Sequence, residues 1–563
     1  MATPARTRPV LVAILLALTL FAAACGSKKS PEAATGGTAV SGSRSTDVTI
    51  AASGSPHVGG TLNVAINAES DGWDPTKNRW TVAGTQVGLA VFDPLAAYDA
   101  DGNAQPYLAQ SITPNADFTE WTITLRSGIT FSDGTPLTAD VLKTIFAAHK
   151  ASALTAPAIA ALDSVKITGT LTAVFEMSKP WAAFSSSLTG QLGMVPSPGQ
   201  LADPDGTQKP IGTGPFTMTT WTLNTSVKTL KNPTYWRKDE SGTQLPYLDG
   251  VNFKVVTESV DAVDAVLSGD LDMGNTSSPA ASVKADNAAK SGDLQLVESQ
   301  GQSESDFAIL NLSAPPFDSP AAREAIARAT DTAAYRQDYN QGEAEESHTV
   351  FRPGTKYFAD SPYPTYDLDK AKAAVAQYAQ EEGKPLAFTF LTDASTTSAQ
   401  QAQILQAQWK AAGMDVTIQA EESSKQIADA VTGNYQAAQW SQFGSPDPDY
   451  DYLWWVTANA APVGQPSLNI ARSKDIKIDQ ALDAARSTND PEVRKQRYAA
   501  FSDRLNIDLP YIWFSRPRYL TYADNSVRGI TQGPLPDGEP SYPMGGPGGF
   551  ALASRLTQTW LDR

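Results

Sequence analysis

The stretch 209–251 constrains the fold more than any other part of the chain, because it combines tight turns with large aromatic side chains. Glycine, proline and asparagine favour turns in it at 212–215, 232–233 and 246–250. After the first turn, the spacing of Phe216, Met218 and Trp221 predicts a half-buried strand. The residues 251–256 predict a second strand.

The chain is long enough to need more than one hydrophobic core. It has 563 residues, of which 41% are hydrophobic, so at least two lobes are expected. Its formal net charge is −17 with only 43 lysines and arginines. That balance argues against a nucleic acid as partner and against electrostatic binding to an anionic membrane surface.

The first residues have the pattern of a secretory signal. Arg6 and Arg8 precede an apolar run at 10–21, and three alanines lead to Cys25. We predict a signal peptide at 1–24, a lipid-modified Cys25, and a flexible tether over 25–58 that is rich in Ser, Gly, Thr and Ala. The alternative is a plain signal peptide cut near Ala24, which would leave the single cysteine as a free thiol. No later run is apolar enough to predict a transmembrane helix.

Further segments predict regular elements in a definite order. A strand opens at Gly60 and leads to a loop with Trp73, and a second strand over 121–125 precedes a helix capped by Thr138. His149 closes that helix, where a cationic side chain would favour the helix dipole.

The second half of the chain alternates helices and strands. A strand is predicted at 307–312, and helices are predicted to begin at Ser319-Pro320 and at Asp490-Pro491 and to lie around 368–379 and 399–412. Strands after Gly413 and over 509–515 are also expected. Such alternation is typical of an α/β lobe with a mixed sheet.

These blocks, taken in order from 59 to about 529, resemble the family 5 extracytoplasmic solute-binding proteins of ABC importers, the oligopeptide, dipeptide and nickel group. The resemblance implies an α/β fold, the two-lobe periplasmic-binding-protein type II fold with an extra inserted domain (cluster C type). Mapped onto this chain, lobe I covers 59–93, 209–307 and 519–563, the extra domain covers 94–208, and lobe II covers 308–518.

Catalytic and metal-binding patterns are missing from the sequence. The three histidines lie in the tether (His57), at a helix end (His149) and in an acidic loop (His348). No nucleophile, zinc or nucleotide motif occurs, so we expect no enzyme activity, no catalytic residue, no metal and no cofactor. A two-carboxylate glycosidase stays open, because acidic pairs are abundant in this chain.

The resemblance also implies where a solute would bind. It places in the cleft Trp73, then Trp440, Ser441, Gln442, Phe443, Gly444 and Asp447, and finally Tyr511 and Trp513 of the returning strand. Tyr511 or Phe514 would take the inward face instead of Trp513 if the register differed by one residue. Peptide-binding relatives have an aspartate three residues after the tryptophan, where this chain has Phe443 or Gly444. A peptide amine therefore lacks its usual partner, unless Asp447 or another acid substitutes.

The function implied is capture of a peptide or peptide-like solute between two lobes, and its delivery to an ABC permease with ATPase subunits. The protein is expected to be a monomer, held on the outer face of the bacterial cell membrane by lipid at Cys25. Two alternatives remain. One is a neutral or sugar-like solute stacked on Trp440 and Trp513, and the other is an extracytoplasmic hydrolase.

Overall fold

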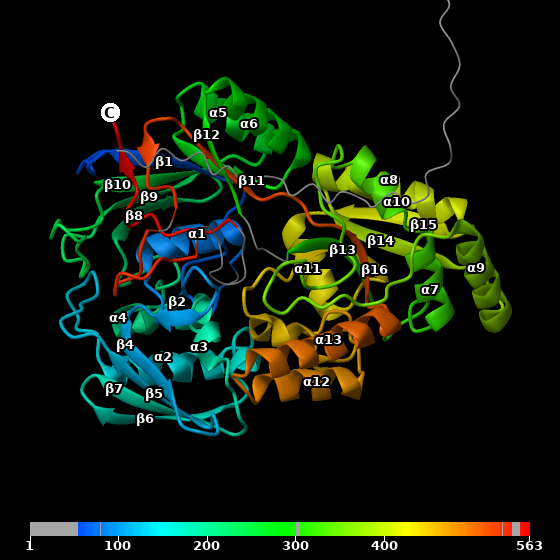
Figure 1. Cartoon of the computed structure of the whole chain (residues 1–563), viewed down its shortest axis with the longest axis horizontal. Coiled ribbons are helices and arrows are strands. Elements are labelled where there is room, and N and C mark those ends of the chain that lie inside the picture. The colour runs from blue at the N-terminus through cyan, green and yellow to red at the C-terminus, as the bar shows by residue number, and fades with distance from the viewer. Residues whose placement is uncertain (1–53, 79, 300–303, 532, 543–551) are drawn as a thin grey trace, which may run out of the picture. The chain divides into compact units, whose positions relative to one another are not determined.

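The computed structural model describes residues 54–78, 80–299, 304–531, 533–542 and 552–563 (Figure 1). The signal peptide predicted at 1–24, Cys25 and most of the predicted tether lie outside the described residues. Three large sheets carry the described chain, and each contributes to its own hydrophobic core.

The aromatic-rich segment forms one side of a seven-stranded sheet, with strand order β12-β18-β11-β1-β10-β9-β8. The strand bounds are β1 (Thr61–Ile66), β8 (Phe216–Thr222), β9 (Ser226–Lys231), β10 (Gly250–Val255), β11 (Met273–Thr276), β12 (Gln295–Glu298) and β18 (Leu520–Ala523). Strand β1 is parallel to β10 and β11, and β8, β9 and β10 pair in antiparallel fashion. The two strands predicted after the turns of 209–251 are confirmed as β8 and β10.

Helices α1 (Val82–Val91), α5 (Ser259–Leu267) and α6 (Pro279–Ser291) belong to the same part of the fold. Helices α5 and α6 pack beside β11 and β12 (Figure 1). Gly214 shows why 209–251 needs its glycines, since a Cβ there would lie 2.4 Å from the backbone carbonyl carbon of Val91. The close approach fixes the segment against the end of α1.

A four-stranded antiparallel sheet has the order β4-β5-β7-β6. Its strands are β4 (Ala109–Pro114), β5 (Glu120–Leu125), β6 (Leu162–Gly169) and β7 (Thr172–Met177), and α2 (Ala139–Ala151) packs on it. The small elements around it are β2 (Ala96–Tyr98), β3 (Ala104–Pro106), α3 (Phe184–Ser187) and α4 (Pro198–Ala202).

Helix α2 begins and ends as predicted, but two expected details are wrong. Thr138 occupies the N-cap position without a side-chain capping hydrogen bond. His149 is fully buried, and its Nδ1 lies 3.1 Å from Thr155 Oγ1. Burial lowers the pKa of His149 to about 4, so the ring is neutral and supplies no charge to the helix end.

The second half of the chain forms a five-stranded mixed sheet, with order β15-β14-β16-β13-β17. The strands are β13 (Ser305–Leu310), β14 (Ala387–Asp393), β15 (Asp415–Glu421), β16 (Ala437–Gln442) and β17 (Tyr511–Ser515). Strand β14 is parallel to β15 and β16, whereas β13 is antiparallel to β16 and β17. The predicted mixed sheet is therefore confirmed.

The predicted helices of this half are confirmed as α7, α9, α10 and α13, and α8, α11 and α12 were not predicted. Their bounds are α7 (Pro320–Ala329), α8 (Thr332–Asp338), α9 (Leu368–Glu382), α10 (Thr396–Ala411), α11 (Ser423–Thr432), α12 (Ile476–Arg486) and α13 (Pro491–Asp508). Asp490 caps α13 by accepting the backbone N–H of Glu492 and Val493, with Pro491 at the first helical position.

The C-terminal residues return to the first sheet's core, where β19 (Val527–Arg528) pairs with β20 (Trp560–Leu561). The division into lobe I, extra domain and lobe II at the boundaries given above stays a prediction. Among the described helices, none combines the length and the apolar character needed to cross a bilayer.

Candidate functional site

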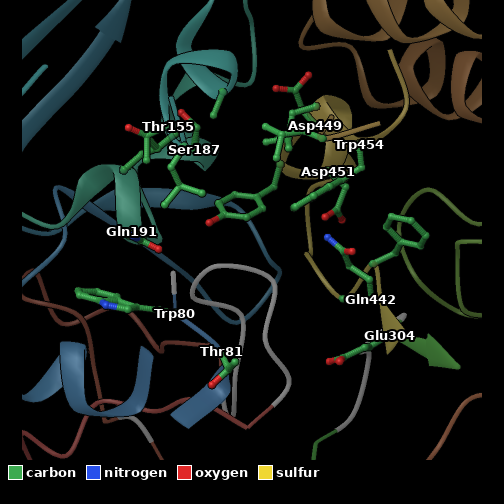
Figure 2. A pocket seen from close by; sticks show the side chains of 18 of the residues that line it. Trp80, Thr81, Thr155, Ser187, Gln191, Glu304, Gln442, Asp449, Asp451 and Trp454 are labelled. Atoms are coloured by element: carbon green, nitrogen blue, oxygen red, sulfur yellow. The ribbon is translucent and has the colours of Figure 1, made fainter. Parts of the chain in front are cut away.

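A cavity of about 440 Å³ lies between two sets of segments (Figure 2). One wall comes from the loop before α1 and from residues around α3, and includes Trp80, Thr81, Thr155, Ser187 and Gln191. The facing wall comes from the end of β16 and the 3-10 helix Pro448–Trp454, together with Glu304 and Arg486. Among the described residues, the tryptophans that line it are Trp80, Trp181, Trp440 and Trp454.

The end of β16 brings five of the predicted site residues to this cavity, namely Trp440, Ser441, Gln442, Phe443 and Gly444. The register of β16 against β13 pairs Trp440 with Phe307. Trp440 Nε1 donates a hydrogen bond to Gln442 Oε1 at 2.8 Å. Phe443 has a positive φ of 75° and stacks its ring on Phe307 at 5.2 Å, so the strand ends there and the chain turns along the cavity.

Tyr511 and Trp513 are not among the residues that line the cavity. Both lie in β17 and are buried, with ring centroids 5.0 and 5.1 Å from that of Phe307. Their rings support the wall from behind, through Phe307 and Phe443. Phe514 is also buried, and it contacts Tyr335 on the other side of the sheet. The predicted contact of Tyr511 and Trp513 with a solute stays untested.

Trp73 is not brought to the cavity either. Its side chain is 1% exposed and packs against Trp221 and Trp80, with ring centroids 5.5 and 6.4 Å away. Trp80, seven residues further on, lines the cavity instead, and its Nε1 donates to the carbonyl of Gly72 at 2.9 Å. The predicted contact of Trp73 with a solute stays a prediction, and Trp80 is the tryptophan of this loop that lines the cavity.

Asp447 is fully engaged by an arginine. The guanidinium of Arg494 donates to its two carboxylate oxygens at 2.6 and 2.8 Å, and Ser186 Oγ donates to Oδ2 at 3.2 Å. Burial alone would raise the pKa of Asp447, but the charge and hydrogen bonds of Arg494 hold it below its usual value. Asp447 also caps the 3-10 helix by accepting the N–H of Asp449. It does not line the cavity, so its predicted role as a substitute amine partner has no geometric support.

Asp449 is paired in the same way but does line the cavity. Arg486 Nε and Nη2 donate to its two oxygens at 2.7 and 3.0 Å, and Trp181 Nε1 donates to Oδ2 at 2.6 Å. The guanidinium of Arg486 lies 3.5 Å from the ring centroid of Tyr452. The pair is locally neutral and held by both walls of the cavity.

Asp451 differs from both. It lines the cavity, is 5% exposed, and forms no ion pair with a lysine, arginine or histidine of the described chain. Burial raises the pKa of Asp451 to about 8, and the negative charge of Glu304 adds to the shift. Glu304 lines the same cavity and accepts a hydrogen bond from Ser441 Oγ at 3.4 Å.

The sequence interpretation missed Asp451, Glu304, Trp80 and Trp454. One usable signal was present, since Asp447, Asp449 and Asp451 alternate along D-P-D-Y-D and any cation that pairs with them has to come from another part of the chain. The short segment between Gly444 and Trp455 contains no arginine or lysine.

A second cavity of about 450 Å³ shares Glu304, Trp440 and Ser441 with the first. Its other lining residues include Asp306, whose pKa is raised by burial to about 7. Within the described residues, no group of three or more His, Cys, Asp or Glu side chains is arranged to hold a metal ion. His348 pairs with Asp360 at 3.0 Å, in keeping with a surface loop.

Comparison with known proteins agrees with this architecture. Residues 103–462 match the model of the bacterial extracellular solute-binding proteins, family 5 Middle. The nickel-binding periplasmic protein of Escherichia coli (strain K12) is 25% identical over 476 residues, which cover 79% of this chain and 87% of the relative. The glutathione-binding protein GsiB of Salmonella paratyphi A is 26% identical over 465 residues, covering 80% of this chain and 87% of the relative.

The fold is also that of a solved binding protein. The periplasmic binding protein DppA from Helicobacter pylori, in complex with the peptide STSA, superimposes with a TM-score of 0.77 at 20% identity, covering 90% of this chain and 99% of that chain. The expected α/β periplasmic-binding-protein fold is thereby confirmed. Because the family model spans most of the described body, the chain belongs to the bacterial extracellular solute-binding proteins of family 5.

Proposed function

We propose that this protein captures a small peptide or peptide-like solute in the cavity between Trp80 and Trp440 and delivers it to an ABC permease. The supporting observation is the cavity itself, which has aromatic walls and a small number of polar side chains, as solute sites commonly do. Relatives named for glutathione, nickel and di- or tripeptides make a small extracytoplasmic solute the natural cargo. The role proposed is binding, not hydrolysis, and an associated ATPase would supply the energy for import.

The segments that form the two walls suggest how capture works. Trp80 and Gln191 precede the five-stranded sheet in the chain, whereas Gln442 ends β16 and Trp454 follows it. Movement of one wall relative to the other would open and close the cavity around a solute. The chain would bend near β13 and β17, where it passes between the two predicted lobes. Small-angle scattering is expected to show a smaller radius of gyration when the solute is bound.

The test is native mass spectrometry of the protein purified from the bacterium that encodes it. We expect a population that carries one additional small molecule, released by denaturation and identified by its fragmentation. The Trp440→Ala protein is expected to retain less of it, and the exposed-site variant Tyr366→Ala is expected to retain as much as the wild type. A protein that neither retains a small molecule nor binds any from a host extract would contradict the proposal.

We also propose that Cys25 carries a lipid, which would hold a monomeric protein on the outer face of the cell membrane. The support is the pattern of basic residues, apolar run and small residues before a single cysteine. Cys25→Ser is expected to move the protein from the membrane fraction to the medium or to leave the precursor uncut. A fully processed Cys25→Ser protein that still sediments with membranes would refute the anchor.

A further inference from the structure

Among the described residues that line the cavity, Asp451 is a buried carboxylate with no cationic side chain bound to it. Asp451 is 5% exposed and lines the cavity beside Trp454 and Gln442, on the wall opposite Trp80 (Figure 2). Its described polar contact is the backbone N–H of Ser445. A carboxylate removed from water in this way is costly unless a positive partner reaches it.

The charged groups around Asp451 do not supply that partner. Glu304 and Asp447 are negative and both raise the pKa of Asp451. Arg486 is the cationic side chain among the described lining residues, and it is bound to both oxygens of Asp449. Arg494 is likewise held by Asp447. Within the described chain, Asp451 therefore has no cationic side chain to pair with when it ionises.

The aromatic lining favours the same kind of solute. Indole rings attract organic cations through the negative face of the π system, and tryptophan does so better than tyrosine or phenylalanine. Trp80, Trp440 and Trp454 come from three separate segments and give both walls of the cavity aromatic surface.

We propose that the solute carries an ammonium group and that the carboxylate of Asp451 accepts its hydrogen bonds, while the rest of the solute packs against the tryptophans. This inference rests on the proposed function of the same cavity. Gln442 offers an amide to orient the neighbouring part of the solute. Asp451 thus takes the role for which Phe443, Gly444 and Asp447 are unsuited.

The test uses two probes that share one body, phenethylamine and 2-phenylethanol, in calorimetric titrations at about pH 8. We expect the amine to bind at least about tenfold more tightly than the alcohol, a difference of ~1.4 kcal/mol. In Asp451→Asn the preference should fall to near unity. The control Asp415→Asn removes an exposed carboxylate at the start of β15 and should leave the preference unchanged.

Three outcomes would overturn the inference. They are equal binding of the two probes by the wild type, a preference that survives in Asp451→Asn, and no binding of either probe. If Asp451→Asn did not fold, the wild-type preference and identification of the retained solute would decide. A retained solute that is neutral or anionic would refute the ammonium proposal but leave the proposed function intact, whereas absence of any retained or bound solute would refute both.

Discussion

Asp449 and Asp451 are two residues apart on one short helix, yet their surroundings are opposite. Asp449 is held by two hydrogen bonds from Arg486, which comes from α12, and by the indole N–H of Trp181. Asp451 is buried to a similar extent and has no cationic partner in the described chain. Burial alone therefore does not show that an acidic residue stabilises the fold, because that role also needs a cationic partner. The carboxylate of Asp449 links segments from the two walls of the cavity, whereas the carboxylate of Asp451 is proposed to bind the solute.

Asp447 resembles Asp449 and differs from Asp451, because an arginine binds its carboxylate as well. Arg494 of α13 engages both of its oxygens, and the pair is further enclosed by Tyr357 and Tyr498, whose hydroxyls accept hydrogen bonds from Arg494. Two acids of the alternating series are thus neutralised by helices that arrive 37 and 47 residues later. Asp451 is the acid of this series that no arginine or lysine of the described chain binds.

The largest expected effect is loss of one arginine partner. Arg494→Met removes the cation and leaves Asp447 buried and charged, so we expect the free energy of unfolding to fall by about 3–5 kcal/mol. Urea denaturation measures it. Arg497→Met, on an exposed position of the same helix, is the control and should change stability by less than about 0.5 kcal/mol. If the free energy of unfolding fell by less than about 1 kcal/mol in Arg494→Met, the pair of Asp447 and Arg494 would not stabilise the fold as proposed.

Asp451→Asn is expected to act in the opposite direction. The pKa of Asp451 is about 8 in the folded protein and near 3.8 when unfolded, so between these values the folded state holds a proton that the unfolded state has lost. Stability contributed by this group is therefore lost as the pH rises from about 4 to about 8. Asparagine does not titrate, so the variant should equal the wild type near pH 4 and exceed it by about 1–4 kcal/mol near pH 8.

Thermal or urea unfolding at the two pH values checks this expectation. A variant that is destabilised at pH 8 as much as at pH 4 would show that Asp451 is a structural acid like its neighbours. Asp415→Asn again serves as the control, since an exposed carboxylate has little to gain from losing its charge.

A smaller effect is expected from the aromatic wall. Trp440→Ala removes a half-buried indole from the cavity, so phenethylamine should bind more weakly by about 1–2 kcal/mol while the protein stays folded. Calorimetry gives the affinity, with Tyr366→Ala as the control outside the cavity. Unchanged affinity in Trp440→Ala would place the bound cation away from this wall.

Much of the fold could be predicted because its signals are local. The turns of 209–251, the capped helix at Asp490-Pro491 and the strand after Gly413 are all set by neighbouring residues. The resemblance to family 5, and no local signal, predicted residues 440–444 to lie in the cleft, and they line the cavity as one continuous segment at a strand end.

The rest of the site depends on contacts between distant segments. All five residues of β17 are buried, so alternation could not tell which side chains of Tyr511–Ser515 face a cleft. The state of Asp447 depends on Arg494, and that of Asp451 on the absence of such a partner, which no local pattern reports. Trp80 lines the cavity because Trp73 already fills the core behind it.

The most direct test of the difference between Asp449 and Asp451 is to measure whether a proton is released when an amine binds. Phenethylamine is titrated into the protein at pH 7 in buffers of different ionisation enthalpy, so that the buffer dependence of the heat gives the number of protons exchanged. With a pKa of about 8, Asp451 is mostly protonated in the empty cavity, and a bound ammonium group should lower that pKa. We predict that binding releases close to one proton in the wild type and none in Asp451→Asn. Binding with no proton release, or with the same release in the variant, would contradict the account.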